Sequence, residues 1–146
     1  MTPTLVVILG PTAVGKTELT LSLAEHFNCP VLNCDSRQIY RDMKIGTASP
    51  TPEQLCRARH YFVGQLSLDD YYSAARYEQE VLSLTAELFK THSTLILSGG
   101  SMMYIDAVCN GIDDIPTIDE EVRNTLSTRL REEGLDTLLA ELRLVD

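Results

Sequence analysis

The chain has 146 residues, which is enough for a domain with a hydrophobic core of its own. Hydrophobic residues make up 44% of the chain and charged residues 23%, as in ordinary soluble globular proteins. The net charge of −9 argues mildly against nucleic acid as a partner of this surface, because phosphate backbones attract Lys and Arg.

The cysteines and the start of the chain indicate a cytoplasmic protein without a membrane anchor. The cysteines form no C-x-x-C pair and do not cluster with the histidines, so buried free thiols are expected rather than zinc ligands. The apolar run near the start spans five residues with no basic residue before it, which fits neither a signal peptide nor a membrane span. We also expect a monomer. The cysteines are Cys29, Cys34, Cys56 and Cys109.

Apolar runs and turn residues predict strands that alternate with helices. The predicted strands are 4–9, 31–35, 60–63 and 94–98, and the predicted helices are 18–27, 53–59, 74–89 and 102–108. Strand 4–9 is continuously apolar and is therefore expected to be fully buried. Asn28 is a plausible end for the first helix, and Ser73 is a good N-cap for the third. The fold class is α/β, a P-loop-containing parallel sheet flanked by helices.

The last part of the chain changes in character. Residues 120–133 carry a narrow apolar stripe, Gly134 interrupts it, and 135–142 carry a second stripe, which together predict a helical hairpin. We place residues 1–116 in the α/β core and 117–146 in the beginning of a helical insertion. The chain stops without a polar tail, and we expect it to be the amino-terminal part of a longer protein.

The most informative stretch is a glycine loop between the first strand and the first helix. It fits the P-loop pattern G-x-x-x-x-G-K-[ST], in which successive backbone N–H groups and a helix N-terminus face a phosphate or nucleotide such as ATP. Lys16 supplies a positive charge for terminal phosphate oxygens, and Thr17 offers its hydroxyl to Mg²⁺. The alternative is an ordinary glycine turn. The predicted phosphate-binding residues are Gly10, Pro11, Thr12, Ala13, Val14, Gly15, Lys16 and Thr17.

Two further strand ends are expected at the same edge of the sheet as this loop. Asp35 ends the second strand and would face the phosphates, unless it belongs to a plain surface turn. The strand at 94–98 ends in Ser98 and lacks the acid that holds magnesium in many P-loop nucleotidases, so Asp35 is the best available carboxylate near the metal. Gly99 and Gly100 indicate either a second close approach of backbone to ligand or a tight turn.

The combination of these motifs resembles the bacterial tRNA dimethylallyltransferase (tRNA isopentenyltransferase) family. The most specific stretch is Asn-Cys-Asp-Ser-Arg-Gln-Ile-Tyr at 33–40. The others are the P-loop, Ile-Gly-Thr-Ala at 45–48, Tyr-Ser-Ala-Ala at 72–75 and Gly-Gly-Ser-Met-Met-Tyr at 99–104. The resemblance implies that a dimethylallyl group passes from dimethylallyl diphosphate to N6 of the adenosine 3′-adjacent to the tRNA anticodon, and that the P-loop holds the diphosphate.

The resemblance also implies roles for individual residues. Asp35 would take the proton from the amine, while Lys16 and Ser101 would act at the reacting diphosphate; Ser101 stands where the family has Thr. Mg²⁺ would bind at Thr17, and residues 117–146 would begin the tRNA-binding insertion. The implied contacts to the tRNA anticodon loop are Asp35, Ser36, Arg37, Gln38, Ser101 and Arg123.

Three other functions stay open at this point. A related P-loop adenylate isopentenyltransferase shares much of the pattern. A small-molecule kinase would need a base pocket and an arginine-rich lid, and the sequence contains no arginine-rich lid segment. A phosphate-binding module without enzymatic activity is the third.

Overall fold

The computed structural model describes residues 2–11, 13–112 and 118–145. The chain divides into two compact units, Met1–Ile112 and Asp113–Asp146, and each is described by itself. The predicted boundary between residues 116 and 117 falls in the segment 113–117, which lies outside the described residues.

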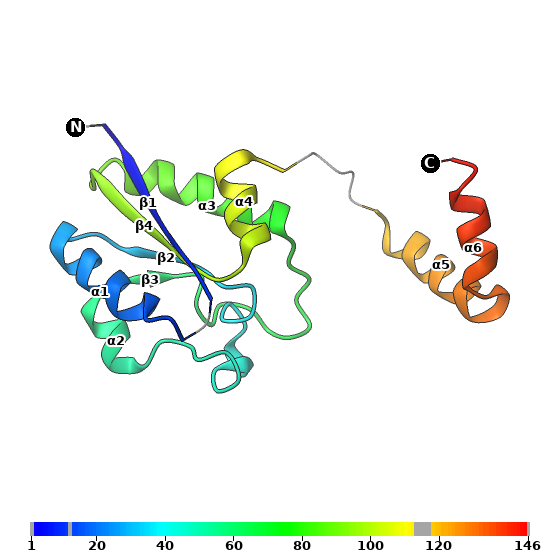
Figure 1. Cartoon of the computed structure of the whole chain (residues 1–146), viewed down its shortest axis with the longest axis horizontal. Helices are drawn as coiled ribbons and strands as arrows, with labels where there is room; N and C mark the ends of the chain where they lie inside the picture. Colours follow the sequence, from blue (N-terminus) through cyan, green and yellow to red (C-terminus); the bar gives the residue numbers. More distant parts are fainter. Residues whose placement is uncertain (1, 12, 113–117, 146) are drawn as a thin grey trace. The chain divides into compact units, whose positions relative to one another are not determined.

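The first unit is an α/β fold whose strands are all parallel (Figure 1). In the described residues the strand order is β1-β4-β2-β3, so each neighbouring pair needs a crossover. This confirms the predicted fold class. The strands are β1 Thr4–Leu9, β2 Val31–Cys34, β3 His60–Tyr61 and β4 Thr94–Gly99. The helices are α1 Lys16–Phe27, α2 Pro52–Arg57, α3 Ala74–Leu88 and α4 Met102–Asn110, with a 3₁₀ turn η1 at Arg41–Met43.

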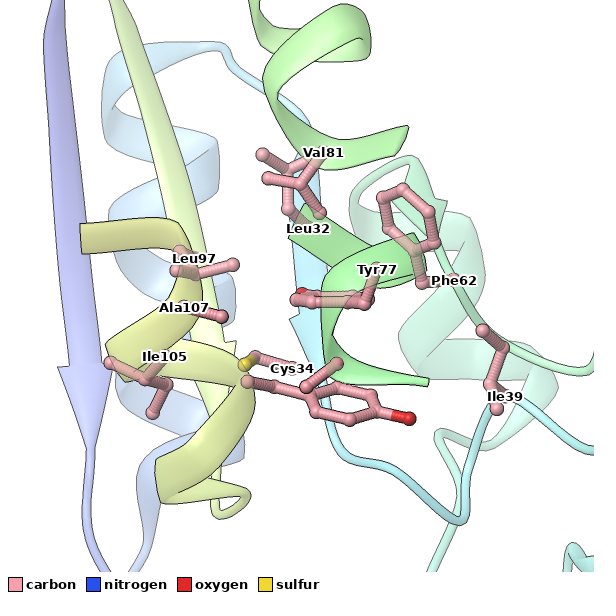
Figure 2. Packing of buried hydrophobic residues seen from close by; sticks show 11 residues of the cluster. Leu32, Cys34, Ile39, Phe62, Tyr77, Val81, Leu97, Ile105 and Ala107 are labelled. Carbon is pink, nitrogen blue, oxygen red and sulfur yellow. The ribbon is translucent and has the colours of Figure 1, made fainter. Parts of the chain in front are cut away.

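The core lies on both faces of the sheet because successive side chains of a strand point to opposite faces. On one face, α3 and α4 cover the sheet; Figure 2 shows side chains of both helices gathered against strand residues. They are Tyr77, Val81, Ile105 and Ala107 from the helices and Leu32, Cys34 and Leu97 from the strands. On the other face, Ala24 of α1 packs with Val31 and Ile96. The buried Tyr77 hydroxyl donates to the Asn33 carbonyl at 2.9 Å, which ties α3 to the end of β2.

β1 is less buried than its sequence predicts. We expected a fully buried strand, but only Ile8 is buried, and Leu9 keeps 56% of its surface exposed. The reason is its position: among the described residues β1 is one of the two edge strands of the sheet, with β4 as its one neighbour. Two apolar residues of α1, Leu19 and Phe27, are likewise exposed, so the apolar face of this helix is narrower than expected.

Local chemistry explains where the helices begin and end. α1 begins at Lys16, two residues earlier than expected. The preceding Gly15 adopts a left-handed backbone conformation, which glycine tolerates, and the helix starts directly after it. The helix ends at Asn28, as predicted. Asn28 has a left-handed backbone conformation, and its N–H donates a hydrogen bond back to the Ala24 carbonyl. Ser73 caps α3 through a bond from the Arg76 N–H at 3.2 Å, which confirms that prediction.

The expectation of four buried thiols is half correct. All four cysteines are free, and Cys29 and Cys34 are buried, but Cys56 and Cys109 are exposed on helices. Burial raises the pKa of the Cys34 thiol to about 12.

The second unit is the predicted helical hairpin, α5 at Glu120–Glu133 and α6 at Leu135–Leu142. Arg129 of α5 links the two helices through an ion pair to Glu141 of α6 at 2.6 Å, and it also pairs with Glu133 of its own helix at 2.8 Å. Within the part of the chain that the structure describes, no helix is long and apolar enough to cross a bilayer.

Candidate active site

The glycine loop forms an open helix N-terminus. Gly15 has φ +94° and is the N-cap of α1, so it has no side chain that could bond the first N–H groups of the helix. Ala13, with φ +65°, holds a left-handed conformation that costs a non-glycine residue energy. The strained loop therefore leaves backbone donors and the positive end of the α1 dipole available to an anion.

Lys16 is folded back onto this loop. Its Nζ atom donates to the Gly10 carbonyl at 2.7 Å and to the Pro11 carbonyl at 2.6 Å. The ammonium group is thus held at the loop by neutral carbonyls that an incoming phosphate can replace as acceptor. Thr17 and Val14 are exposed, and Thr12 lies outside the described residues.

A pocket of about 370 Å³ joins the loop to the second strand end. Its wall at the loop is formed by Ala13, Gly15, Lys16 and Thr17, and Asp35 lines the same pocket. The structure thus places residues of the predicted phosphate-binding loop and the carboxylate of Asp35 in one cavity, at the carboxyl edge of the sheet.

The carboxylate of Asp35 is oriented by its own turn. Its Oδ1 atom accepts hydrogen bonds from the backbone N–H groups of Arg37 at 2.9 Å and Gln38 at 3.2 Å. Among the described residues, Oδ2 has no hydrogen-bond partner. The structure shows the turn, which one carboxylate oxygen fixes, and the same side chain lines the pocket.

Gln38 holds the loop at 47–48 in place at the wall of the pocket. Its Nε2 group donates to the carbonyls of Thr47 at 2.9 Å and Ala48 at 3.3 Å. Gln38, Thr47, Ala48 and Pro50 all line the pocket. The side chain that the resemblance assigns to tRNA is therefore engaged in holding a wall of the cavity.

The pocket is also lined by polar groups for which the sequence predicted no role in the site. Ser98 and Thr20 share a buried hydroxyl hydrogen bond of 2.7 Å, and Asn33 donates to the Phe62 carbonyl at 3.1 Å. His60 also lines the pocket; its Nδ1 donates to the Ala58 carbonyl at 2.8 Å, and burial lowers the pKa of the imidazole. These residues are far apart along the chain. The parallel pairing of β2 with β3 and β4 brings Asn33, His60 and Ser98 together, and the packing of α1 on β4 adds Thr20.

Gly99 and Gly100 also line the pocket, but Gly99 has a second role. It pairs with Cys34 in the β2–β4 register, where an added Cβ would overlap the Cys34 carbonyl. Close backbone packing therefore requires a glycine at Gly99, whether or not a ligand approaches it.

The other predicted contact residues lie elsewhere. Ser36 and Ser101 are bonded to each other beside Asp35, and Arg37 is exposed next to them; of the described pocket-lining residues, none is one of these three. Arg123 lies on α5, in the second unit.

A parallel α/β sheet with this loop at its carboxyl edge defines a protein of the P-loop phosphate-binding class. Comparison with known proteins narrows the class. A family model described as IPP transferase matches residues 38–146. The chain belongs to this family.

Individual relatives agree with this assignment. The chain is 63% identical over 146 residues to tRNA dimethylallyltransferase 1 of Phocaeicola vulgatus, of which it covers 49%. The full-length tRNA isopentenylpyrophosphate transferase of Bacillus halodurans superposes with a TM-score of 0.74 at 32% identity, over 99% of this chain and 48% of that one. A eukaryotic dimethylallyltransferase acting on tRNA gives a TM-score of 0.73 at 26% identity, over 82% of this chain and 31% of that one. The chain spans about half the length of the curated relatives it matches.

Proposed function

We propose that the protein to which this chain belongs transfers a dimethylallyl group from dimethylallyl diphosphate to N6 of the adenosine 3′-adjacent to the anticodon of tRNA, and releases diphosphate. The family and the names of the relatives support this reaction. The single structural observation behind it is that Lys16 and Asp35 line one pocket. One end of that pocket suits a diphosphate, and the other provides a carboxylate for the nucleophile.

At the diphosphate end, the reaction breaks an allylic C–O bond, so negative charge develops on the leaving group. Lys16 and the open N–H groups at the start of α1 stabilise charge at that place. Lys16 would then leave the Gly10 and Pro11 carbonyls when the diphosphate arrives. The apolar atoms of Val31, Ala48 and Pro50 in the same pocket suit the short prenyl chain.

At the nucleophile end, the exocyclic amine of adenine must lose a proton as the new C–N bond forms. Asp35 is the carboxylate that lines the pocket and is placed to accept this proton. Its Oδ1 atom is already bonded to Arg37 and Gln38, which leaves Oδ2 for the amine. A stacked adenine cannot reach a pocket of this kind, so we infer that the base is flipped out of the anticodon loop.

Mg²⁺ fits the donor atoms of the pocket. The Thr17 hydroxyl, which lines the pocket, is an oxygen ligand of the kind that Mg²⁺ prefers, and the carboxylate of Asp35, whose Oδ2 is left for the amine, adds negative charge to the same pocket. Among the described residues, no group of three or more His, Cys, Asp or Glu side chains forms a metal cage, so diphosphate oxygens and water would complete the coordination. When bound, the ion would neutralise charge on the leaving diphosphate, and Thr17 would hold it.

We assign the tRNA contacts by position and charge. The exposed Arg37 stands directly beside Asp35 in the turn, where an incoming anticodon loop would meet it. The net charge of −9 makes this chain a poor tRNA binder by itself, and we infer that basic residues elsewhere in the full-length protein supply most of the affinity. Arg123 and the α5–α6 hairpin would begin that tRNA-binding part.

We also propose a compartment and an assembly state for the full-length protein. Free thiols on all four cysteines fit the reducing cytoplasm, where tRNA is processed. We propose that the protein acts there as a monomer, which the mass of the full-length protein in solution tests.

The experiment that tests the function mixes full-length protein with dimethylallyl diphosphate labelled in its prenyl group and offers two acceptors. We expect label on unmodified tRNA and none on AMP. Label on AMP would favour an adenylate isopentenyltransferase. Phosphate transfer from ATP without prenyl transfer would favour a small-molecule kinase and overturn the proposal.

A further inference from the structure

We propose that Ser101 is a positioning residue for Asp35, and that its hydroxyl acts through the protein backbone rather than on the diphosphate. This inference rests on the proposed function. It differs from the roles that the family resemblance implies for Ser101, which are action at the reacting diphosphate and contact with the tRNA.

The first observation is that Ser101 bonds to both chain neighbours of Asp35. The Ser101 N–H donates to the Cys34 carbonyl at 3.2 Å. The Ser101 hydroxyl oxygen accepts a hydrogen bond from the Ser36 N–H at 2.8 Å. The backbone is therefore fixed immediately before and immediately after Asp35.

The second observation is that the hydroxyls of Ser101 and Ser36 are bonded to each other. Ser101 donates to the Ser36 Oγ atom at 3.1 Å. One hydroxyl thus accepts from the main chain of Ser36 and donates to its side chain, which fixes the turn as well as the strand end.

The third observation is that the Ser101 side chain does not cap α4, although Ser101 is at the N-cap position. It is the N-cap residue of α4, where a serine side chain normally accepts from an N–H of the first helical turn. Here it makes no such bond within the helix. The hydroxyl is instead directed across the sheet edge to the turn that carries the carboxylate.

The turn completes the orientation of the carboxylate. Asp35 Oδ1 accepts hydrogen bonds from the N–H groups of Arg37 and Gln38 in the same turn. The position of the carboxylate therefore depends on the position of the turn. Without the Ser101 hydroxyl, the N–H and the side chain of Ser36 lose their bonds to Ser101, and only the backbone bond from the Ser101 N–H to the Cys34 carbonyl remains. A carboxylate displaced by about 1 Å is expected to reduce a proton-transfer rate by about a hundredfold.

The experiment uses the full-length protein with Ser101→Ala and Ser101→Thr, and Ser73→Ala as the matched control. Ser73→Ala also removes a serine hydroxyl bond to a backbone N–H at a helix start, but on α3, outside the described pocket lining. The readouts are kcat, the KM for dimethylallyl diphosphate, and hydrogen exchange of the backbone at 35–38.

For Ser101→Ala we expect kcat to fall about 10- to 100-fold while the KM for dimethylallyl diphosphate changes less than about twofold. Amide exchange at 35–38 should rise. Ser101→Thr retains the hydroxyl and should restore both, and Ser73→Ala should leave both unchanged.

Two results would overturn the inference: a raised KM with kcat intact, which indicates contact with the diphosphate, or unchanged exchange at 35–38 in Ser101→Ala. Exchange is read without substrate, so it separates this inference from the proposed function. Failure of the unmodified protein to prenylate tRNA would instead count against that function.

Discussion

The backbones of Gly99 and Cys34 approach each other so closely that no side chain fits between them. The two residues are register partners at the ends of β4 and β2, and a Cβ added to Gly99 would overlap the Cys34 carbonyl carbon and oxygen. Because the obstacle is backbone in the middle of a sheet, it cannot move aside as a flexible side chain would.

Gly99→Ala should therefore destabilise the fold by about 3 kcal/mol or more, since the strand ends must separate. The matched control is Gly46→Ala, where an added Cβ meets nothing within 4 Å and should change stability by no more than about 0.5 kcal/mol. Urea unfolding of both variants measures the difference. Equal midpoints would mean that the two strands are not in close contact.

Gln38→Ala should loosen the pocket wall at 47–48 without unfolding the protein. The substitution removes the two bonds from Nε2 to the carbonyls of Thr47 and Ala48, and a hydrogen bond contributes about 0.5–1.5 kcal/mol to stability. We expect faster hydrogen exchange in residues 44–50. Gln54→Ala, which breaks a capping contact at α2, is the control and should leave 44–50 unchanged. Similar exchange in both variants would show that Gln38 does not hold the loop.

Lys16→Ala should weaken binding of the prenyl donor. It removes the ammonium group that now rests on the Gly10 and Pro11 carbonyls and that we assign to the diphosphate. A hydrogen bond to a charged group contributes about 1.5–3 kcal/mol, so affinity for dimethylallyl diphosphate should fall about 10- to 150-fold. Calorimetric titration of the full-length protein measures this, and unchanged affinity would remove Lys16 from the phosphate site.

The cysteines should differ in reactivity according to their burial. Cys34 is fully buried, and its raised pKa of about 12 leaves almost no thiolate at neutral pH, whereas Cys56 is exposed on α2. A brief pulse of iodoacetamide on native protein should label Cys56 and spare Cys34, and unfolding in urea should make both react. Mass spectrometry of the peptides reads the sites, and labelling of native Cys34 would mean that the core is open.

The sequence predicts the fold well because its signals are local. Apolar runs predict β2 and β4, and capping residues predict the helix ends. The P-loop motif predicts the strand before it and the helix after it. The exposure of β1 could not be predicted, because strand order decides which strand is an edge and nothing in the composition of 4–9 encodes that order.

The candidate site was predictable in part for the same reason. Lys16 and Asp35 stand in recognisable motifs, and parallel strands bring both to one edge. His60 and the pair of Thr20 and Ser98 belong to no motif, so only tertiary pairing places them in the pocket. The bond between Ser101 and Ser36 spans 65 positions and depends on a rotamer, which no sequence pattern specifies.

Asp35→Ala in the full-length protein tests most directly whether Asp35 takes the proton from the attacking amine. We expect prenyl transfer to tRNA to fall by about 100- to 10,000-fold, the usual range for loss of a general base, while dimethylallyl diphosphate still binds with an affinity close to that of the unmodified protein. Transfer at a near-normal rate by this variant would contradict the account.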